Sequence, residues 1–153
     1  MDKYDDVNMK DCILLKNGYD IDKLINDYII AESNHEFINP EKISKKSFSL
    51  SKETHGWEAI PLHTVNGIVG NQGTIPVEVI DKEFKPNQIL LKCNYFREIL
   101  SDLDTEIYLV RLMKLKSNGY IAPHTDKLLN ENVIRCHIPI ITNPGVNLYI
   151  GNE

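Results

Sequence analysis

The pattern of apolar and polar positions predicts an amphipathic helix near the start of the chain. Five apolar residues recur there at intervals of three and four positions: Ile21, Leu24, Ile25, Tyr28 and Ile29. Residues at these intervals share one face of a helix, and Asp20 just before them is of a type that caps helix N-termini. We therefore predict a helix over 20–31, capped by Asp20, that packs on a sheet.

A second helix is predicted further along, after a region that is mostly loop. Asn94 is a candidate N-cap, and five apolar residues follow it on one side: Tyr95, Phe96, Ile99, Leu100 and Leu103. Residues 32–56 show little periodicity, which predicts a long loop with His35 and His55 exposed.

The remaining apolar runs predict strands joined by turns. From their alternation and their β-favouring residues, we place these strands at 12–15, 57–62, 74–80, 106–116, 133–141 and 146–150. Pro76 makes one of them an edge strand, because proline cannot donate to a sheet. Residues 117–119, Ser-Asn-Gly, are predicted to form a tight turn.

Two of these strands carry basic side chains among apolar ones. On strand 106–116, Arg111 shares a face with four apolar residues, so it either reaches the rim, where it is ion-paired, or points into a cavity that holds an anion. On strand 133–141 the even positions are all apolar and predict a core face. Arg135 and His137 then lie together on the opposite face.

Length and composition restrict the class of protein. A chain of 153 residues suits one domain with a substantial core. Its formal net charge of -5 at pH 7 argues against a nucleic-acid partner, which would need a basic surface. The sequence has neither an apolar run of membrane-spanning length nor a signal peptide, so we expect a soluble, cytoplasmic protein.

Cysteines and glycines indicate no further chemistry. Three cysteines lie far apart in the chain: Cys12, Cys93 and Cys136. They form no CxxC pair, so we expect buried thiols in a reducing compartment. The glycines at 67, 70 and 73 are followed by neither a Lys-Ser/Thr pair nor a helix, which excludes a phosphate-binding loop.

The most informative pattern is His124-Thr125-Asp126. In extended backbone, residues two positions apart point the same way, so an imidazole and a carboxylate lie side by side. These are two corners of the two-His-one-carboxylate arrangement that binds non-haem Fe(II) and leaves positions open for substrate and oxygen. A His-x-Asp pair alone is weakly specific, and its meaning depends on the surrounding sequence.

From residue 57 onward the chain resembles the aspartyl/asparaginyl β-hydroxylase family of Fe(II)- and 2-oxoglutarate-dependent oxygenases. The matching stretches lie at 57–62, 95–100, 110–115, 119–126 and 135–144. The most specific feature is an Arg-x-His at 135–137 that runs into Thr-Asn-Pro at 142–144, shortly after Pro-His-x-Asp at 123–126.

This resemblance implies a mainly β fold with flanking helices, a double-stranded β-helix of the jelly-roll or cupin kind. Residues 57–153 would be the N-terminal portion of that domain, and 1–56 a helical and loop region packed on it. It implies that His124 and Asp126 bind Fe(II). It places Arg135 and His137, together with Arg111, where they meet carboxylates of 2-oxoglutarate or of substrate.

The chain departs from the family pattern at its end. In the family, a second metal-binding His and an Arg for 2-oxoglutarate follow the Thr-Asn-Pro turn, and this chain stops at Glu153 before either. The other candidates, His35, His55 and His63, all lie upstream. We therefore expect a fold that is incomplete at the C-terminus: a fragment, a split protein with a complementing chain, or a fold closed by a partner, which could be a second copy in a homo-oligomer. With only two protein ligands, the site should bind iron weakly, and the isolated chain is expected to be inactive.

Three functions follow as hypotheses. The first is Fe(II)- and 2-oxoglutarate-dependent hydroxylation of a free amino acid or a peptide residue. The second is a non-catalytic, degenerate oxygenase fold that binds a small acid or a protein. The third is a cupin-type isomerase or sugar-binding protein, which would normally carry more than one His on the motif strand.

Overall fold

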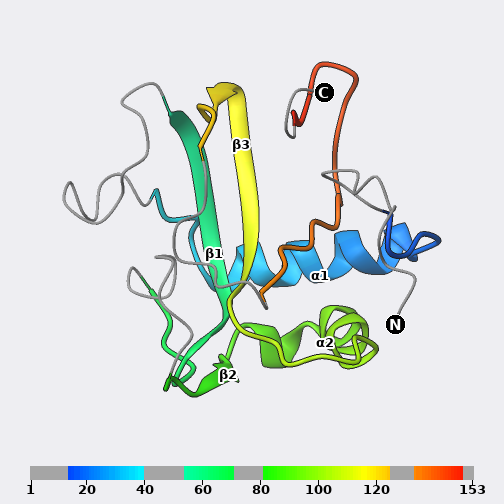
Figure 1. The fold of residues 1–153 in the computed structure, drawn as a ribbon, viewed down its shortest axis with the longest axis vertical. Helices are drawn as coiled ribbons and strands as arrows, with labels where there is room; N and C mark the ends of the chain where they lie inside the picture. Colours follow the sequence, from blue (N-terminus) through cyan, green and yellow to red (C-terminus); the bar gives the residue numbers. More distant parts are fainter. Residues whose placement is uncertain (1–13, 40–53, 71–80, 125–132, 150–153) are drawn as a thin grey trace, which may run out of the picture.

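The computed structural model describes residues 14–39, 54–70, 81–124 and 133–149. Its elements follow in order as α1 (Ile21–Asn34), β1 (His55–Val65), β2 (Phe84–Pro86), the short 3-10 helix η3 (Leu90–Lys92), α2 (Asn94–Ser101) and β3 (Val110–Tyr120). Figure 1 shows β1 and β3 running side by side, with α1 extending to the right from their lower half and α2 below it. A sheet with flanking helices agrees with the predicted mainly β fold with flanking helices, whereas the double-stranded β-helix stays a prediction.

The three strands form one antiparallel sheet in the order β2-β1-β3. Ile60 of β1 lies opposite Leu112 of β3, and both side chains are buried in the core beneath the helices. Neighbouring residues point to the other face of the sheet, where Trp57 lies opposite Leu115. The sheet therefore separates a helix-covered core from a second face that carries Trp57 and Arg111.

The core gathers apolar side chains from both helices, η3 and the sheet. Its buried members are Leu24, Ala31, Ile60, Leu62, Ile89, Leu90, Cys93, Phe96, Ile99 and Leu112. Removing this apolar surface from water is the main favourable contribution to folding.

The first predicted helix is present, but its buried face is rotated from the prediction. Leu24, Asp27 and Ala31 are buried, whereas Ile21 and Ile29 are 50% and 56% exposed. The apolar pattern predicted the wrong buried face because the centre of that face is a polar residue, Asp27, which has a partner in the core. The helix also extends to Asn34, beyond the predicted end at 31.

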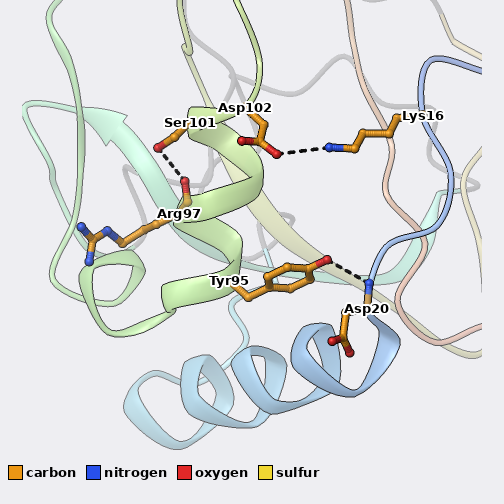
Figure 2. A network of polar contacts seen from close by, with 6 residues as sticks. All are labelled: Lys16, Asp20, Tyr95, Arg97, Ser101 and Asp102. Carbon is orange, nitrogen blue, oxygen red and sulfur yellow. Dashed lines mark hydrogen bonds and ion pairs between the residues drawn. The ribbon is translucent and has the colours of Figure 1, made fainter.

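The cap of this helix is as predicted, and it connects to α2. The side chain of Asp20 accepts a hydrogen bond from the backbone N of Lys23 at 3.1 Å. The backbone N of Asp20 donates to the Tyr95 hydroxyl at 2.9 Å, and Lys16 pairs with Asp102 at 3.2 Å (Figure 2). These contacts join the segment before α1 to both ends of α2.

The second predicted helix begins at Asn94, but Asn94 is not its cap. The N-cap is Cys93, whose side chain makes no capping bond. Instead, the carboxylate of Asp27, on α1, accepts a hydrogen bond from the backbone N of Phe96 at 2.8 Å. A carboxylate at a helix N-terminus satisfies a backbone donor and is stabilised by the helix dipole. Asp27 therefore caps α2 from a neighbouring helix.

Several predicted strands differ from the structure. β1 is longer than 57–62, and β3 spans Val110–Tyr120 in place of 106–116, so the predicted turn at 117–119 lies within a strand. Residues 133–141 and 146–149 are not strands, because a strand requires a hydrogen-bonded neighbour, which an alternating pattern does not supply. Residues 14–15 are not in a strand, and 12–13, 74–80 and 150 lie outside the described residues.

The two described cysteines have opposite environments. Cys93 is buried as predicted, and its thiol donates to the backbone oxygens of Ile89 and Asp27. Burial, and then the charge of Asp27, raise its pKa to about 11. The prediction of a buried thiol is wrong for Cys136, which is exposed because its segment does not enter the core as a strand. Cys12 lies outside the described residues.

We expect Asp27→Ala to lower the free energy of unfolding by about 1–3 kcal/mol, because it leaves a buried backbone N–H without its acceptor. Asn26→Ala, an exposed neighbour on the same helix, should change it by less than about 0.5 kcal/mol. Urea unfolding of both variants measures the difference. Equal values for the two would contradict the capping role.

We expect iodoacetamide at pH 8 to label Cys136 well before Cys93 in the folded chain. A thiol with a pKa of about 11 is ionised in only about one molecule in a thousand at pH 8, and the thiolate is the reacting form. Mass mapping of labelled peptides identifies each site. In urea, Cys93 should react as readily as Cys136, and equal rates in the folded protein would refute the prediction.

Candidate functional site

The predicted metal ligand His124 lies just after β3, with its side chain held by a local hydrogen bond. Its Nδ1 is 2.9 Å from the backbone oxygen of Ala122. A carbonyl oxygen can only accept, so Nδ1 carries the hydrogen. In the neutral ring the lone pair is then on Nε2, the nitrogen that can bind a metal. The second predicted ligand, Asp126, lies outside the described residues.

The residue that receives this bond is itself anchored to the start of β1. Ala122 is 2% exposed, and its backbone N donates to the hydroxyl oxygen of Thr54 at 3.0 Å. Thr54 is also buried, at 5% exposure. The contact joins residues 68 positions apart in the sequence, so it depends on the pairing of β1 with β3.

Two glycines allow the start of β1 and the end of β3 to approach closely, in a region that we call the corner. Gly56 has φ +78°, and a Cβ placed on it would lie 2.8 Å from the Cα of Gly119. Beside them, Nε2 of His55 donates to the backbone oxygen of Asn118 at 3.0 Å, and the ring of His55 lies 6.3 Å from that of Tyr120 between centroids. His55 is exposed, as predicted, whereas His35 is half-buried. This close approach brings the ends of β1 and β3 together next to the segment that carries His124.

Arg111 lies half-buried on the face of the sheet opposite the helices. The central carbon of its guanidinium is 6.0 Å from the ring centre of the buried Trp57, a cation–π contact. Its neighbour Lys114 points to the other face, where it pairs with Glu32 of α1 at 3.2 Å. The hydrogen bond from Lys114 lowers the pKa of Glu32 from its ordinary value. Arg111 thus has an aromatic neighbour, and its predicted role with a carboxylate stays a prediction.

Arg135 and His137 are exposed side chains on the irregular segment 133–149. The predicted core face of this segment is only partly formed, because Ile138 and Ile140 pack against the core while Ile134 is 73% exposed. In Figure 1 residues 121–124 lie at the end of β3 remote from α1, whereas 133–149 begin where the chain crosses α1. The pocket that Arg135 and His137 are predicted to share with His124 therefore stays a prediction.

The part of the chain that the structure describes contains neither a metal cluster nor a membrane-spanning helix. Within 14–39, 54–70, 81–124 and 133–149, three or more His, Cys, Asp or Glu side chains nowhere come together as a metal cluster. In those same ranges, no helix has the length and apolar character needed to cross a membrane.

Comparison with known proteins decides the family. The model of the aspartyl/asparaginyl beta-hydroxylase family matches residues 25–153, most of the chain. The chain belongs to this family. Membership assigns it to hydroxylases, a class of oxidoreductase, and confirms the resemblance seen in the sequence. No curated protein and no solved structure matches the chain significantly.

No pattern in the sequence indicated the role of Thr54. A threonine in a segment without periodicity is ordinary, and its contact with Ala122 is formed only when distant strands pair. Gly56 and Gly119, each one residue from the end of its strand, were visible in the sequence. Gly119 was assigned to a turn, because glycine is common there, and Gly56 to the loop 32–56.

We expect Gly56→Ala to destabilise the chain by about 1–3 kcal/mol more than Gly18→Ala. Both glycines have a positive φ, near +78° and +77°, so both variants incur the same backbone strain. Only Gly56 would bring a new Cβ against backbone, whereas Gly18 has open space around it. Thermal and urea unfolding of the two variants compares them, and an equal loss would show that the corner is not close-packed.

Proposed function

We propose that this chain carries the iron-binding His-x-Asp of an Fe(II)- and 2-oxoglutarate-dependent hydroxylase that acts on an amino acid or an amino-acid residue. Family membership supports a hydroxylase. The observation that carries the finer proposal is the bond from Nδ1 of His124 to the oxygen of Ala122. Histidines that bind metals usually donate their other ring hydrogen to a carbonyl or carboxylate in this way.

His124 and Asp126 would supply two of the three protein ligands of such an Fe(II) site. His124 offers an imidazole nitrogen in the required tautomer, and Asp126, two residues on, offers a carboxylate. When bound, the iron together with 2-oxoglutarate and oxygen supplies the oxidation of an unactivated C–H bond. His124 must be unprotonated to bind it, so metal binding should weaken at low pH.

The basic residues have a matching role in this proposal. Arg135, His137 and Arg111 would hold the carboxylates of 2-oxoglutarate or of substrate, because a guanidinium binds a carboxylate through two parallel hydrogen bonds. Residues 57–153 would form part of a double-stranded β-helix, with 1–56 packed on it. The antiparallel sheet of β1, β2 and β3 is compatible with that architecture.

We expect the chain, supplied with Fe(II), 2-oxoglutarate and a mixture of amino acids, to produce succinate, and His124→Ala to lower the rate at least tenfold. Asp126→Ala should have a comparable effect because it removes the neighbouring ligand. Succinate is measured by mass spectrometry. His35→Ala is the matched control, because Nδ1 of His35 also binds a backbone oxygen, that of Glu36, outside the proposed site.

Turnover that survives His124→Ala would contradict the assignment of the metal ligand. If neither the wild-type chain nor any variant produces succinate, but the wild-type chain binds 2-oxoglutarate, the result supports a binding module in place of an enzyme. Isothermal titration with 2-oxoglutarate separates these outcomes.

A further inference from the structure

We infer that Thr54 is a positioning residue, which orients the imidazole of His124 without touching metal or substrate. The inference rests on the proposed function, and it adds a residue that lies outside the His-x-Asp motif. Two consecutive hydrogen bonds carry it. The N–H of Ala122 donates to Oγ1 of Thr54 at 3.0 Å, and the oxygen of Ala122 accepts from Nδ1 of His124 at 2.9 Å.

The backbone between these two bonds has little freedom. Pro123 follows Ala122, and a residue before proline is restricted to extended conformations. The ring of Pro123 also restricts its own φ to about -65°. Because rotation about the backbone bonds of Ala122 and Pro123 is limited, the hydrogen bond from the N–H of Ala122 to Thr54 also sets the direction of the carbonyl oxygen of Ala122. That oxygen in turn selects the tautomer and the ring orientation of His124.

Burial makes this anchor consequential. Thr54 and Ala122 are 5% and 2% exposed, so water cannot easily replace the hydroxyl if it is removed. A buried N–H without an acceptor is costly, and the backbone around it would have to move to find one. Any such movement turns the carbonyl of Ala122. The effect of losing Thr54 should therefore reach His124 as altered geometry as well as lowered stability.

The chain offers a matched control close by in the sequence. Thr54 lies just before β1 and Thr64 lies on it, buried at 1% exposure, and the hydroxyl of Thr64 donates to the backbone oxygen of Ile68 at 2.8 Å. Valine at either position keeps the shape of the side chain and removes one hydrogen bond. Only the bond at Thr54 leads to His124. Thr64→Val therefore measures what a merely structural loss does.

The experiment titrates the full chain with Co(II), followed by its visible absorption, in wild type and in Thr54→Val, Thr54→Ser, Thr64→Val and His124→Ala. We expect Thr54→Val to raise the Co(II) dissociation constant about tenfold, the range found for residues that support metal ligands. Thr54→Ser should restore the wild-type value to within about threefold, because it keeps the acceptor. Thr64→Val should leave it unchanged even if both valine variants are equally destabilised.

A second readout separates this inference from the proposed function. Imidazole ¹⁵N shifts of the metal-free chain report the tautomer of His124, and Thr54→Val should lower the Nδ1–H population while Thr64→Val does not. If wild type and His124→Ala bind Co(II) equally, the proposed metal role fails, and the shifts alone decide whether Thr54 positions the ring. If His124→Ala abolishes binding but both valine variants bind like wild type with unchanged shifts, the inference is overturned. If Thr54→Val does not fold, Thr54→Cys, whose sulfur is a weaker acceptor, takes its place. Its Co(II) dissociation constant must then lie between the wild-type value and the tenfold increase expected for Thr54→Val, or the inference is overturned.

Discussion

The antiparallel pairing of β1 with β3 is the constraint on which the rest of the structure depends. It places Ile60 against Leu112 in the core and, on the opposite face, Trp57 beneath Arg111. At its far end the same pairing brings Thr54 to Ala122. A one-residue slip in this register would turn every one of these side chains to the wrong face. Core and candidate site therefore share a single geometric cause.

Two buried polar side chains, each bonded to the backbone of other elements, join α1 to α2 and η3 to the sheet. Asp27 accepts from the N-terminus of α2. Asn87 accepts from the backbone N of Ile89 and of Leu90 at 3.0 and 3.1 Å and donates to the oxygen of Pro61 at 2.7 Å, so it connects η3 with β1. Buried polar groups without partners are costly, so these bonds specify one arrangement among the many that apolar contacts alone would allow.

Local signals predicted the parts of the fold that have local causes. The cap at Asp20 was predicted correctly because it depends on neighbouring residues, whereas the N-terminus of α2 is capped by Asp27 of another helix, and the predicted cap Asn94 was wrong. The strand predicted at 133–141 failed because alternation describes two faces and says nothing of a pairing partner. Its apolar positions did contribute, since Ile138 and Ile140 pack on the core without forming a sheet.

The candidate site also combines features that have local causes with features that depend on residues distant in the sequence. His124 could be proposed as a ligand from the sequence because a metal pair at spacing two is a local pattern, and this role stays a prediction. Its tautomer, by contrast, depends on a carbonyl whose direction we infer to be set by Thr54, the residue just before β1. A candidate ligand can thus be proposed from a few adjacent residues, whereas the orientation of its side chain requires the paired strands. This is why the motif could be proposed from the sequence and the contact with Thr54 could not.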